Sequence, residues 1–358
     1  MSQDIYRTLA RRLDALPNGY PATDSGVELR LLERLFTPEQ AALAAQLRLT
    51  LETAEQLSAR LGMEYVPLRK QLKEMVRRGL IAAGPVEHGL GYGLMPFVVG
   101  IYEMQLGRLD KETAELFEQY HRQAFGQMAG IQPAFHRVVP VNESIRRDLS
   151  VHPSESAAAI IANHQAWGVV DCLCRVQKAL VGEPCPHPVD VCMVLSSRPG
   201  AFDHDEIVRA LTQEEALNTL HRAAEAGLVH SVSNNQQGLT YICNCCTCAC
   251  GILRGMVELG IANVVARSSY VNTVDEDLCL LCGACVEKCQ FNALELETAL
   301  VIHAQRCTGC GVCTLACPEG ALTLVLRPAD EQPAIPETHD DWLAARAAAR
   351  GIDLSDVL

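Results

Sequence analysis

Two runs of four cysteines near the C-terminal end constrain this chain more than any other feature. The first run is Cys279-x2-Cys282-x2-Cys285-x3-Cys289, and the second is Cys307-x2-Cys310-x2-Cys313-x3-Cys317, followed by Pro318. Three cysteines at this spacing can bind three corners of one 4Fe–4S cluster, while the fourth points toward another cluster. A zinc site needs only CxxC pairs, so the third cysteine of each triplet would have no role. The pattern therefore predicts two iron–sulfur clusters.

These residues resemble a bacterial-type ferredoxin with two 4Fe–4S clusters, and the resemblance covers about residues 271–326. It implies crossed ligation, in which each run lends its fourth cysteine to the other cluster. One cluster would then be held by Cys279, Cys282, Cys285 and Cys317, and the other by Cys307, Cys310, Cys313 and Cys289. The proline usual after the fourth cysteine is present as Pro318 but is replaced by Gln290 in the first half.

The other nine cysteines form a second constellation between residues 172 and 250. They are Cys172, Cys174, Cys185, Cys192, Cys243, Cys245, Cys246, Cys248 and Cys250. Apolar residues precede Cys172 and predict a strand, on which alternate positions would place the sulfurs of Cys172 and Cys174 on one side. The sequence thus predicts that these cysteines are metal ligands.

Five of these cysteines fall within residues 243–250, together with the polar Asn244 and Thr247. Buried structural thiols need apolar neighbours, which this stretch lacks. Disulfides are disfavoured in a reduced compartment, which leaves zinc or one or two further iron–sulfur clusters, and we favour the clusters. Because adjacent residues of an extended chain point opposite ways, Cys245 and Cys246 are expected to serve two different metal centres.

The whole chain also resembles uncharacterised bacterial iron–sulfur proteins that join a winged-helix-like front, a CxCR module and a ferredoxin end. Cys172-Leu173-Cys174-Arg175 and the cysteines of residues 243–250 carry that resemblance. No activity comes with it, so no catalytic residue is assigned. A guanidinium at Arg175 beside a negatively charged cluster would favour the reduced form.

The N-terminal part has apolar residues at helical spacing and two capping patterns, beginning at Thr37 and Thr53. Helix, glycine turn, helix and a glycine-rich hairpin resemble a winged helix-turn-helix over about residues 25–100. Five cations are expected on the outer face of its second helix: Arg69, Lys70, Lys73, Arg77 and Arg78. They either bind DNA or form the solvated face of a docking or dimerisation scaffold.

The charge balance of the N-terminal residues favours a docking or dimerisation scaffold over DNA binding. Residues 1–80 carry 12 Lys/Arg against 10 Asp/Glu, whereas the whole chain has a net charge of −13. A balance of +2 is low for a domain that must neutralise several phosphates. We therefore do not expect a nucleic-acid partner, and we consider a homodimer through the N-terminal domain.

The expected fold class is α+β with several domains: an N-terminal winged-helix-like helical domain, a mixed α/β cysteine-rich module and a C-terminal dicluster ferredoxin fold. The expected segments are 1–100 (winged-helix-like), 101–150 (helical connector), 151–270 (cysteine-rich module), 271–326 (ferredoxin) and 327–358 (acidic, proline-containing tail). The tail includes a short helix near residues 340–350, either flexible or docked on the protein or a partner.

The expected function is electron transfer. The chain shows no phosphate-binding loop, dinucleotide fingerprint or haem attachment site. No signal peptide or membrane span is expected, and reduced thiols and labile clusters suit the cytoplasm of an anaerobic cell. We expect an electron-transfer component of an oxidoreductase system with a redox enzyme as partner. Two alternatives stay open: an enzyme with a catalytic cluster in the second module, and a redox-sensing regulator that binds DNA.

Overall fold

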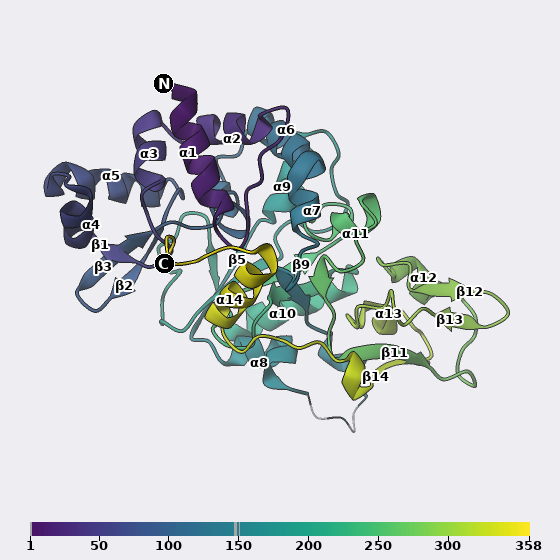
Figure 1. Cartoon of the computed structure of the whole chain (residues 1–358). Helices are drawn as coiled ribbons and strands as arrows, with labels where there is room; N and C mark the ends of the chain where they lie inside the picture. Colours follow the sequence, from purple (N-terminus) through teal and green to yellow (C-terminus); the bar gives the residue numbers. More distant parts are fainter. Residues whose placement is uncertain (1, 147–148, 150) are drawn as a thin grey trace. The chain divides into compact units, whose positions relative to one another are not determined.

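The computed structural model describes residues 2–146, 149 and 151–358, and its elements are labelled in Figure 1. The chain divides into two compact units. Unit 1 comprises Met1–Met128 and Leu343–Leu358, and unit 2 comprises Ala129–Trp342. These limits differ from those of the five segments expected from the sequence. The division into five domains therefore stays a prediction.

Unit 1 is mostly helical. Its helices are α1 (Ser2–Asp14), α2 (Val27–Leu35), α3 (Pro38–Ala44), α4 (Ala54–Leu61), α5 (Tyr65–Arg77), α6 (Lys111–Tyr120) and α7 (Gly126–Met128), with short helical turns η1 (Phe97–Ile101), η2 (Glu103–Gln105) and η3 (His121–Phe125). The capping boxes predicted at Thr37 and Thr53 are both confirmed, each with a glutamine side chain bonded back to the threonine N–H. These caps satisfy N–H groups that the first helical turn leaves unpaired.

A three-stranded antiparallel sheet completes this helical part, in the order β1 (Glu52–Thr53), β3 (Gly89–Gly93) and β2 (Ala82–Val86). The predicted hairpin is therefore confirmed, with Val86 opposite Gly89 beside the turn. The winged-helix resemblance itself stays a prediction.

One of the five predicted surface cations is not on the outer face. Arg78 is half-buried and donates to the Leu35 carbonyl and to Gln40 Oε1. Its guanidinium satisfies the C-terminal end of α2, where carbonyl groups lack helical partners. Arg69, Lys70, Lys73 and Arg77 are exposed.

The C-terminal residues pack onto their own units. In unit 1, the fully buried Arg346 donates to the carbonyls of Pro17 and Met128 at 2.9 and 2.8 Å. In unit 2, Trp342 is buried and its indole N–H donates to the Ala134 carbonyl. Both residues belong to α14 (His339–Arg350), which corresponds to the helix expected in the tail. Of the two readings of the tail, docking on the protein is the one these contacts support.

Unit 2 is built on a seven-stranded mixed sheet. The strand order is β10 (Val265–Ala266), β4 (His136–Val138), β8 (Val229–Ser233), β9 (Tyr241–Cys245), β6 (Cys192–Ser196), β5 (Ala166–Val170) and β7 (Arg209–Leu211). Only β10 and β4 run parallel. Its helices are α8 (Ala157–Ala162), α9 (Leu173–Leu180), α10 (Gln213–Glu225) and α11 (Arg254–Glu258), with turns η4 (Asn142–Ser144), η5 (Pro153–Glu155) and η6 (Ala329–Glu331).

The helical pattern expected for residues 101–150 ends at Met128, where unit 1 gives way to the sheet of unit 2. The main apolar core of the sheet packs its strands against α8 and α10, with Ile160, Met193, Ala216 and Ile242 among its buried members. None of the described helices is long and apolar enough to cross a membrane.

The C-terminal part of unit 2, which carries the two runs of four cysteines, has two short antiparallel pairs of strands. They are β11 (Tyr270–Val274) with β14 (Leu322–Leu326), and β12 (Leu294–Leu296) with β13 (Leu300–Ile302). Two short helices, α12 (Ala284–Lys288) and α13 (Val312–Leu315), each follow a glycine with positive φ, Gly283 or Gly311. The two halves therefore have the same local form: cysteines in a loop, a glycine turn, then a short helix.

Candidate metal centres

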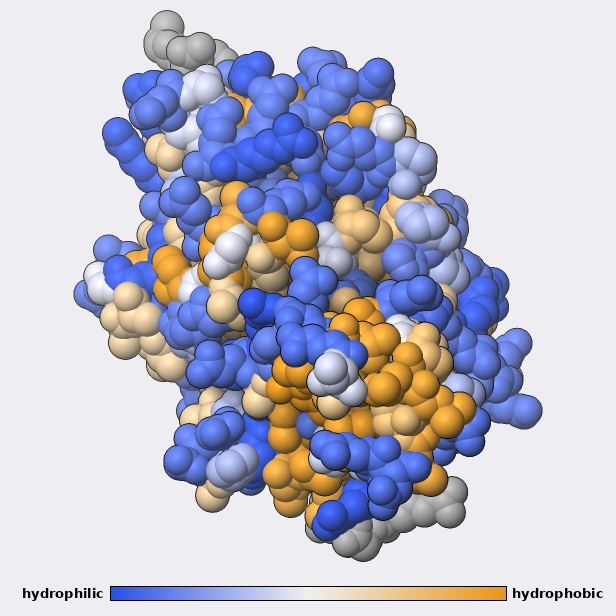
Figure 2. Space-filling model, turned by 90° about the vertical axis from the view of Figure 1, so that its right-hand side faces the viewer, coloured by the Kyte–Doolittle hydropathy of each residue, from blue (hydrophilic) through white to orange (hydrophobic). Residues whose placement is uncertain are grey.

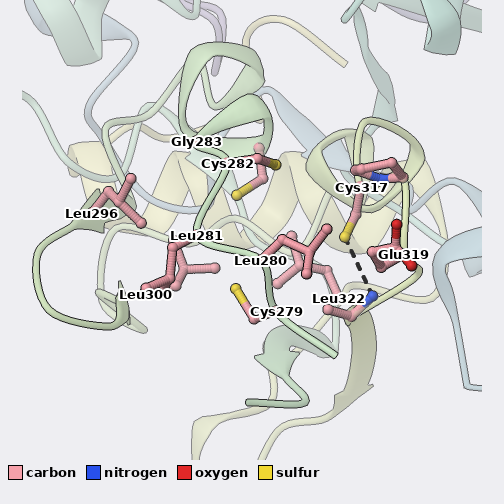
Figure 3. Close-up of a pocket in the computed structure, with 13 residues that line it drawn as sticks. Cys279, Leu280, Leu281, Cys282, Gly283, Leu296, Leu300, Cys317, Glu319 and Leu322 are labelled. Carbon is pink, nitrogen blue, oxygen red and sulfur yellow. Dashed lines mark hydrogen bonds between the residues drawn. The ribbon is translucent and has the colours of Figure 1, made fainter. Parts of the chain in front are cut away.

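Four cysteines from both runs line one recess at the cysteine-rich end. They are Cys279, Cys282 and Cys285 from the first run and Cys317 from the second. Leucines complete the wall, and Figure 3 shows the Cys279 and Cys317 sulfurs near Leu280 and Leu322. The chain thus brings Cys317 to the first triplet across 32 residues of sequence, and four sulfurs surround a largely apolar space.

The remaining cysteines of the two runs form a second group. The electrostatic influence on the Cys313 thiol is largest from Cys310, Cys289 and Cys307 and smaller from Cys285, which places Cys289 of the first run beside the second triplet. Burial raises the pKa of Cys310 to about 12, with further contributions from Cys307 and Cys289. Burial likewise raises the pKa of Cys313. Thiols that are buried this close together are poor anions by themselves, and metal cations would stabilise them as thiolates.

Backbone and side-chain N–H groups donate to these sulfurs. The backbone N–H groups of Ala321 and Ala293 donate to Cys317 and Cys289, both at 3.3 Å. The side-chain amide of Asn272, on β11, donates to Cys313 Sγ at 3.3 Å. Hydrogen bonds of this kind stabilise negative charge on cluster ligands and influence reduction potential. The thiol sets and their donors therefore fit 4Fe–4S clusters.

A third group gathers six cysteines at one edge of the large sheet. Strand β6 is antiparallel to both β5 and β9, so the end of β5, the start of β6 and the end of β9 meet at the same edge. We call the cysteines at this edge the six-thiol group: Cys172, Cys174, Cys192, Cys243, Cys245 and Cys250.

The six thiols form a closed ring of neighbours. Cys172 contacts Cys174 and Cys192, Cys192 contacts Cys243, and Cys243 contacts Cys245. Contacts of Cys250 with Cys245 and Cys174 close the ring. The Cys192 contact is the largest cause of the raised pKa of Cys243, and the Cys174 contact has the same effect on Cys250. The group therefore concentrates more thiols than the four that one cubane needs.

The strand predicted before Cys172 is present as β5, but the expectation that Cys172 and Cys174 lie on it is wrong. Strand β5 ends at Val170, Cys172 is the N-cap of α9, and Cys174 lies in its first turn. The two sulfurs still meet, because a cap residue and the first helical turn fold back toward one another. The strand expected before Cys243 is present as β9, with Cys243 and Cys245 two positions apart on it.

A fourth group contains the other three cysteines and a histidine. We call it the Cys3His group: Cys185, His187, Cys246 and Cys248, whose ligand atoms all lie within 4.8 Å of one another. The structure thus separates Cys245 from Cys246 into different groups, as their opposite directions require. Sequence reasoning missed His187 as a site residue, although its position two residues after Cys185 was the available signal.

Arg175 lies at the Cys3His group and close to the six thiols. Its Nη2 donates to the Asn244 carbonyl at 2.8 Å and to Cys246 Sγ at 3.5 Å, and the residue is only 2% exposed. Desolvation opposes its charge, but the sulfurs of Cys172 and Cys246 outweigh this and raise its pKa. A permanent cation thus lies among the thiols of the second module.

Gln290 connects the ferredoxin-like end to the second module. Its Oε1 accepts from the Thr247 N–H at 2.7 Å, and its Nε2 donates to the Gly227 carbonyl. Thr247 lies between Cys246 and Cys248, and Gln290 directly follows Cys289. Gln290, which replaces the usual proline, therefore links the segment that carries Cys289 to the turn that carries Cys246 and Cys248.

Comparisons with known proteins bear on the C-terminal part alone. A family model described as a 4Fe–4S dicluster domain matches residues 278–321. An uncharacterized ferredoxin of Methanocaldococcus jannaschii is 41% identical over 54 residues, which is 14% of this chain and 87% of that protein. No solved structure matches the chain.

Proposed function

The chain belongs, through its C-terminal part, to the 4Fe–4S dicluster ferredoxins, and from this premise we propose that it relays single electrons at low potential to or from a redox enzyme. The dicluster domain implies two 4Fe–4S clusters, and the cysteine-rich second module allows more. The observation that carries the proposal is the recess in which Cys317 joins Cys279, Cys282 and Cys285.

We assign the ligands in crossed sets. Cys279, Cys282, Cys285 and Cys317 hold one cluster, and Cys307, Cys310, Cys313 and Cys289 hold the other. The shared recess supports the first set. The second is supported by the electrostatic influence on Cys313, which is larger from Cys310, Cys289 and Cys307 than from Cys285. Crossed ligands keep the two clusters close, which suits a relay.

The chain's own residues prepare both sites for electron transfer. A 4Fe–4S cluster, when bound, takes up and releases one electron. The buried Leu300 and Leu322 exclude water from the first site, while Asn272 and backbone N–H groups stabilise charge at the sulfurs. Exclusion of water favours a low potential, because the reduced form carries more negative charge.

We propose a further iron–sulfur cluster in the six-thiol group. Its ring of six thiols at a sheet edge, with the Arg175 cation nearby, supports this assignment. The ring offers two thiols beyond the four ligands of a cubane. This cluster would extend the relay from the ferredoxin-like end into the sheet.

The surface near the first recess suits contact with a redox partner. Figure 2 shows apolar residues gathered on the face turned toward the viewer. The leucines that line the first recess and are exposed are Leu280, Leu281 and Leu296. Residues beyond 80 carry a net charge of −15, which would steer them toward a basic partner surface. Apolar contact and charge steering together favour brief, specific encounters.

The test is Cys317→Ala in the full chain, purified without oxygen and studied by iron and sulfide analysis and by EPR after reduction. The cluster held by the first triplet should be damaged, although Cys317 lies in the second run. Cys289→Ala is the matched control and should damage the other cluster. If Cys317→Ala affects only the cluster of Cys307, Cys310 and Cys313, the crossed assignment is wrong.

A second candidate is a redox-sensing regulator. One observation favours it: Arg69, Lys70, Lys73 and Arg77 line a single surface recess on α5 together with Tyr65 and Val66. In that case a DNA site in unit 1 would respond to the state of a cluster. The low net charge of residues 1–80 opposes this candidate.

A further inference from the structure

The Cys3His group differs from every other thiol group in its compactness. Its three sulfurs are 3.1, 3.2 and 3.6 Å apart, and His187 Nδ1 lies 3.2 Å from Cys185 Sγ and 3.6 Å from Cys248 Sγ. Within residues 2–146, 149 and 151–358, it is the only set of three or more Cys, His, Asp or Glu residues whose ligand atoms all lie within 4.8 Å of one another.

This spacing is that of ligands around one ion. Four ligands at zinc–sulfur bond length, arranged as a tetrahedron, lie about 3.8 Å from each other. Ligands of a cubane bind four separate iron atoms at its outer corners, so they must lie considerably further apart. The four sulfurs that line the recess at Cys279 are not such a compact set among the described residues. The Cys3His group has no room for a cubane.

We propose that Cys185, His187, Cys246 and Cys248 bind a single tetrahedral zinc ion. Mixed sulfur and nitrogen ligands in a tetrahedron select zinc among common divalent metals, and four protein ligands leave no open position. The site is therefore structural and does not take part in electron transfer. It stands independently of the proposed relay and leaves the six-thiol group as the one additional cluster site.

Charge balance supports one ion with these ligands. A zinc ion with three thiolates and a neutral imidazole has a net charge of −1. The buried Arg175 supplies the compensating +1, with its Nη2 3.5 Å from Cys246 Sγ. A charged group in such an environment is stable when its partner is hydrogen-bonded, and the Asn244 carbonyl also accepts from Arg175.

The ion would join two distant loops at the contact with the ferredoxin-like end. Cys185 and His187 come from the connection between α9 and β6, and Cys246 and Cys248 follow β9. Between these last two, Thr247 presents the N–H that Gln290 accepts. By fixing this turn, zinc would hold in place the surface on which Gln290 and its neighbour Cys289 dock.

The test is metal analysis of the full chain purified without oxygen. We expect one zinc per chain in addition to iron, and X-ray absorption at the zinc edge should show three sulfur ligands at about 2.3 Å and one nitrogen at about 2.0 Å. This measurement needs no variant, so it does not depend on the folding of a mutant. Absence of zinc, or a zinc environment of four sulfurs, would overturn the proposal.

Variants then locate the ion. His187→Ala should lose the zinc while iron content stays unchanged, and His187→Cys should restore zinc with four sulfur ligands. His204→Ala, at an exposed histidine, is the matched control and should keep one zinc. Cys172→Ser, in the six-thiol group, should keep the zinc. Loss of about four iron atoms from His187→Ala, with zinc unchanged, would show that the group holds a cluster and that the proposal is wrong.

Discussion

At the scale of single residues, Asn272 shows how one amide can influence a cluster. It is buried, its Nδ2 donates to Cys313 Sγ, and its Oδ1 has no hydrogen-bond partner in the described structure. A buried amide with only half of its capacity used is costly, so the bond to sulfur is the reason we infer for its presence.

We predict that Asn272→Leu lowers the potential of the cluster bound by Cys313. In the parent chain, the Asn272 N–H stabilises the reduced cluster by about 1 kcal/mol. Its removal should therefore lower the potential by roughly 40 mV for one electron. Potentiometric titration followed by EPR measures the shift. The cluster at Cys279 serves as the internal control and should keep its potential. An upward shift, or equal shifts of both clusters, would contradict the role of Asn272.

Single residues also mark the limit of sequence reasoning about the site. The cysteine spacing within the two runs, from Cys279 to Cys317, predicts two thiol groups, and the structure brings both together. Within each run, the short separations along the chain determine where the sulfurs lie. Cys185 joins Cys246 and Cys248 across 61 and 63 residues, and this depends on the sheet between them. No local pattern could have paired them, and a lone His187 between prolines carries little signal by itself.

At the scale of elements, the glycine before a cluster ligand is required by both conformation and space. Gly309 has φ of +72°, and a Cβ there would lie 2.2 Å from the Tyr270 carbonyl oxygen and from Ser268 Oγ. Backbone of β11 and side chain of Ser268 thus enclose the loop that carries Cys307 and Cys310. Any side chain at this position would displace one of the cluster ligands.

We predict that Gly309→Ala loses the cluster bound by the second triplet and unfolds at lower denaturant concentration. Gly283→Ala is the matched control, since Gly283 has a similar φ of +78° but its Cβ would meet only Leu296 Cδ2 at 3.7 Å. The control should cost about 1–2 kcal/mol of conformational strain and keep its iron. Iron analysis and urea unfolding compare the two. Equal iron loss in both variants would mean that the positive φ alone, and not the space around Gly309, makes glycine necessary for cluster binding.

Helix α5 carries the second element-scale prediction. Because residues 1–80 have a net charge of only +2, the full chain should bind duplex DNA no better than any weakly charged protein. Fluorescence anisotropy over a range of salt concentrations measures this, with Lys70→Glu/Lys73→Glu as the comparison. Salt-dependent, sequence-specific binding at nanomolar protein that the double variant abolishes would favour the regulator instead.

Elements were predicted best where local rules decide them. The caps at Thr37 and Thr53 and the hairpin of β2 and β3 follow from capping and turn chemistry. The strand expected through Cys172 and Cys174 failed because β5 ends at Val170 and α9 begins immediately. A short apolar run shows that a strand exists but does not show where it stops.

At the scale of the whole chain, unit 2 combines two modules that sequence alone treats as separate. The sheet with its two additional thiol groups and the ferredoxin-like end share contacts from Gln290 to Thr247 and Gly227, and from Ser144 to Gly311. The departure at Gln290 is visible in the sequence, but its partners are 43 and 63 residues away. Its role therefore becomes evident only from the packed structure.

The last prediction tests this connection with Gln290→Pro, which restores the residue usual after the fourth cysteine. The ferredoxin-like end should keep its iron, because no ligand changes. The Thr247 N–H loses its acceptor, so its hydrogen exchange should accelerate by roughly fivefold for about 1 kcal/mol of lost bond. Gln332→Ala, which removes a similar bond to the Arg327 carbonyl, is the control and should leave Thr247 unchanged. If exchange at residues 243–250 is the same in Gln290→Pro as in the parent chain, Gln290 does not hold the two modules together.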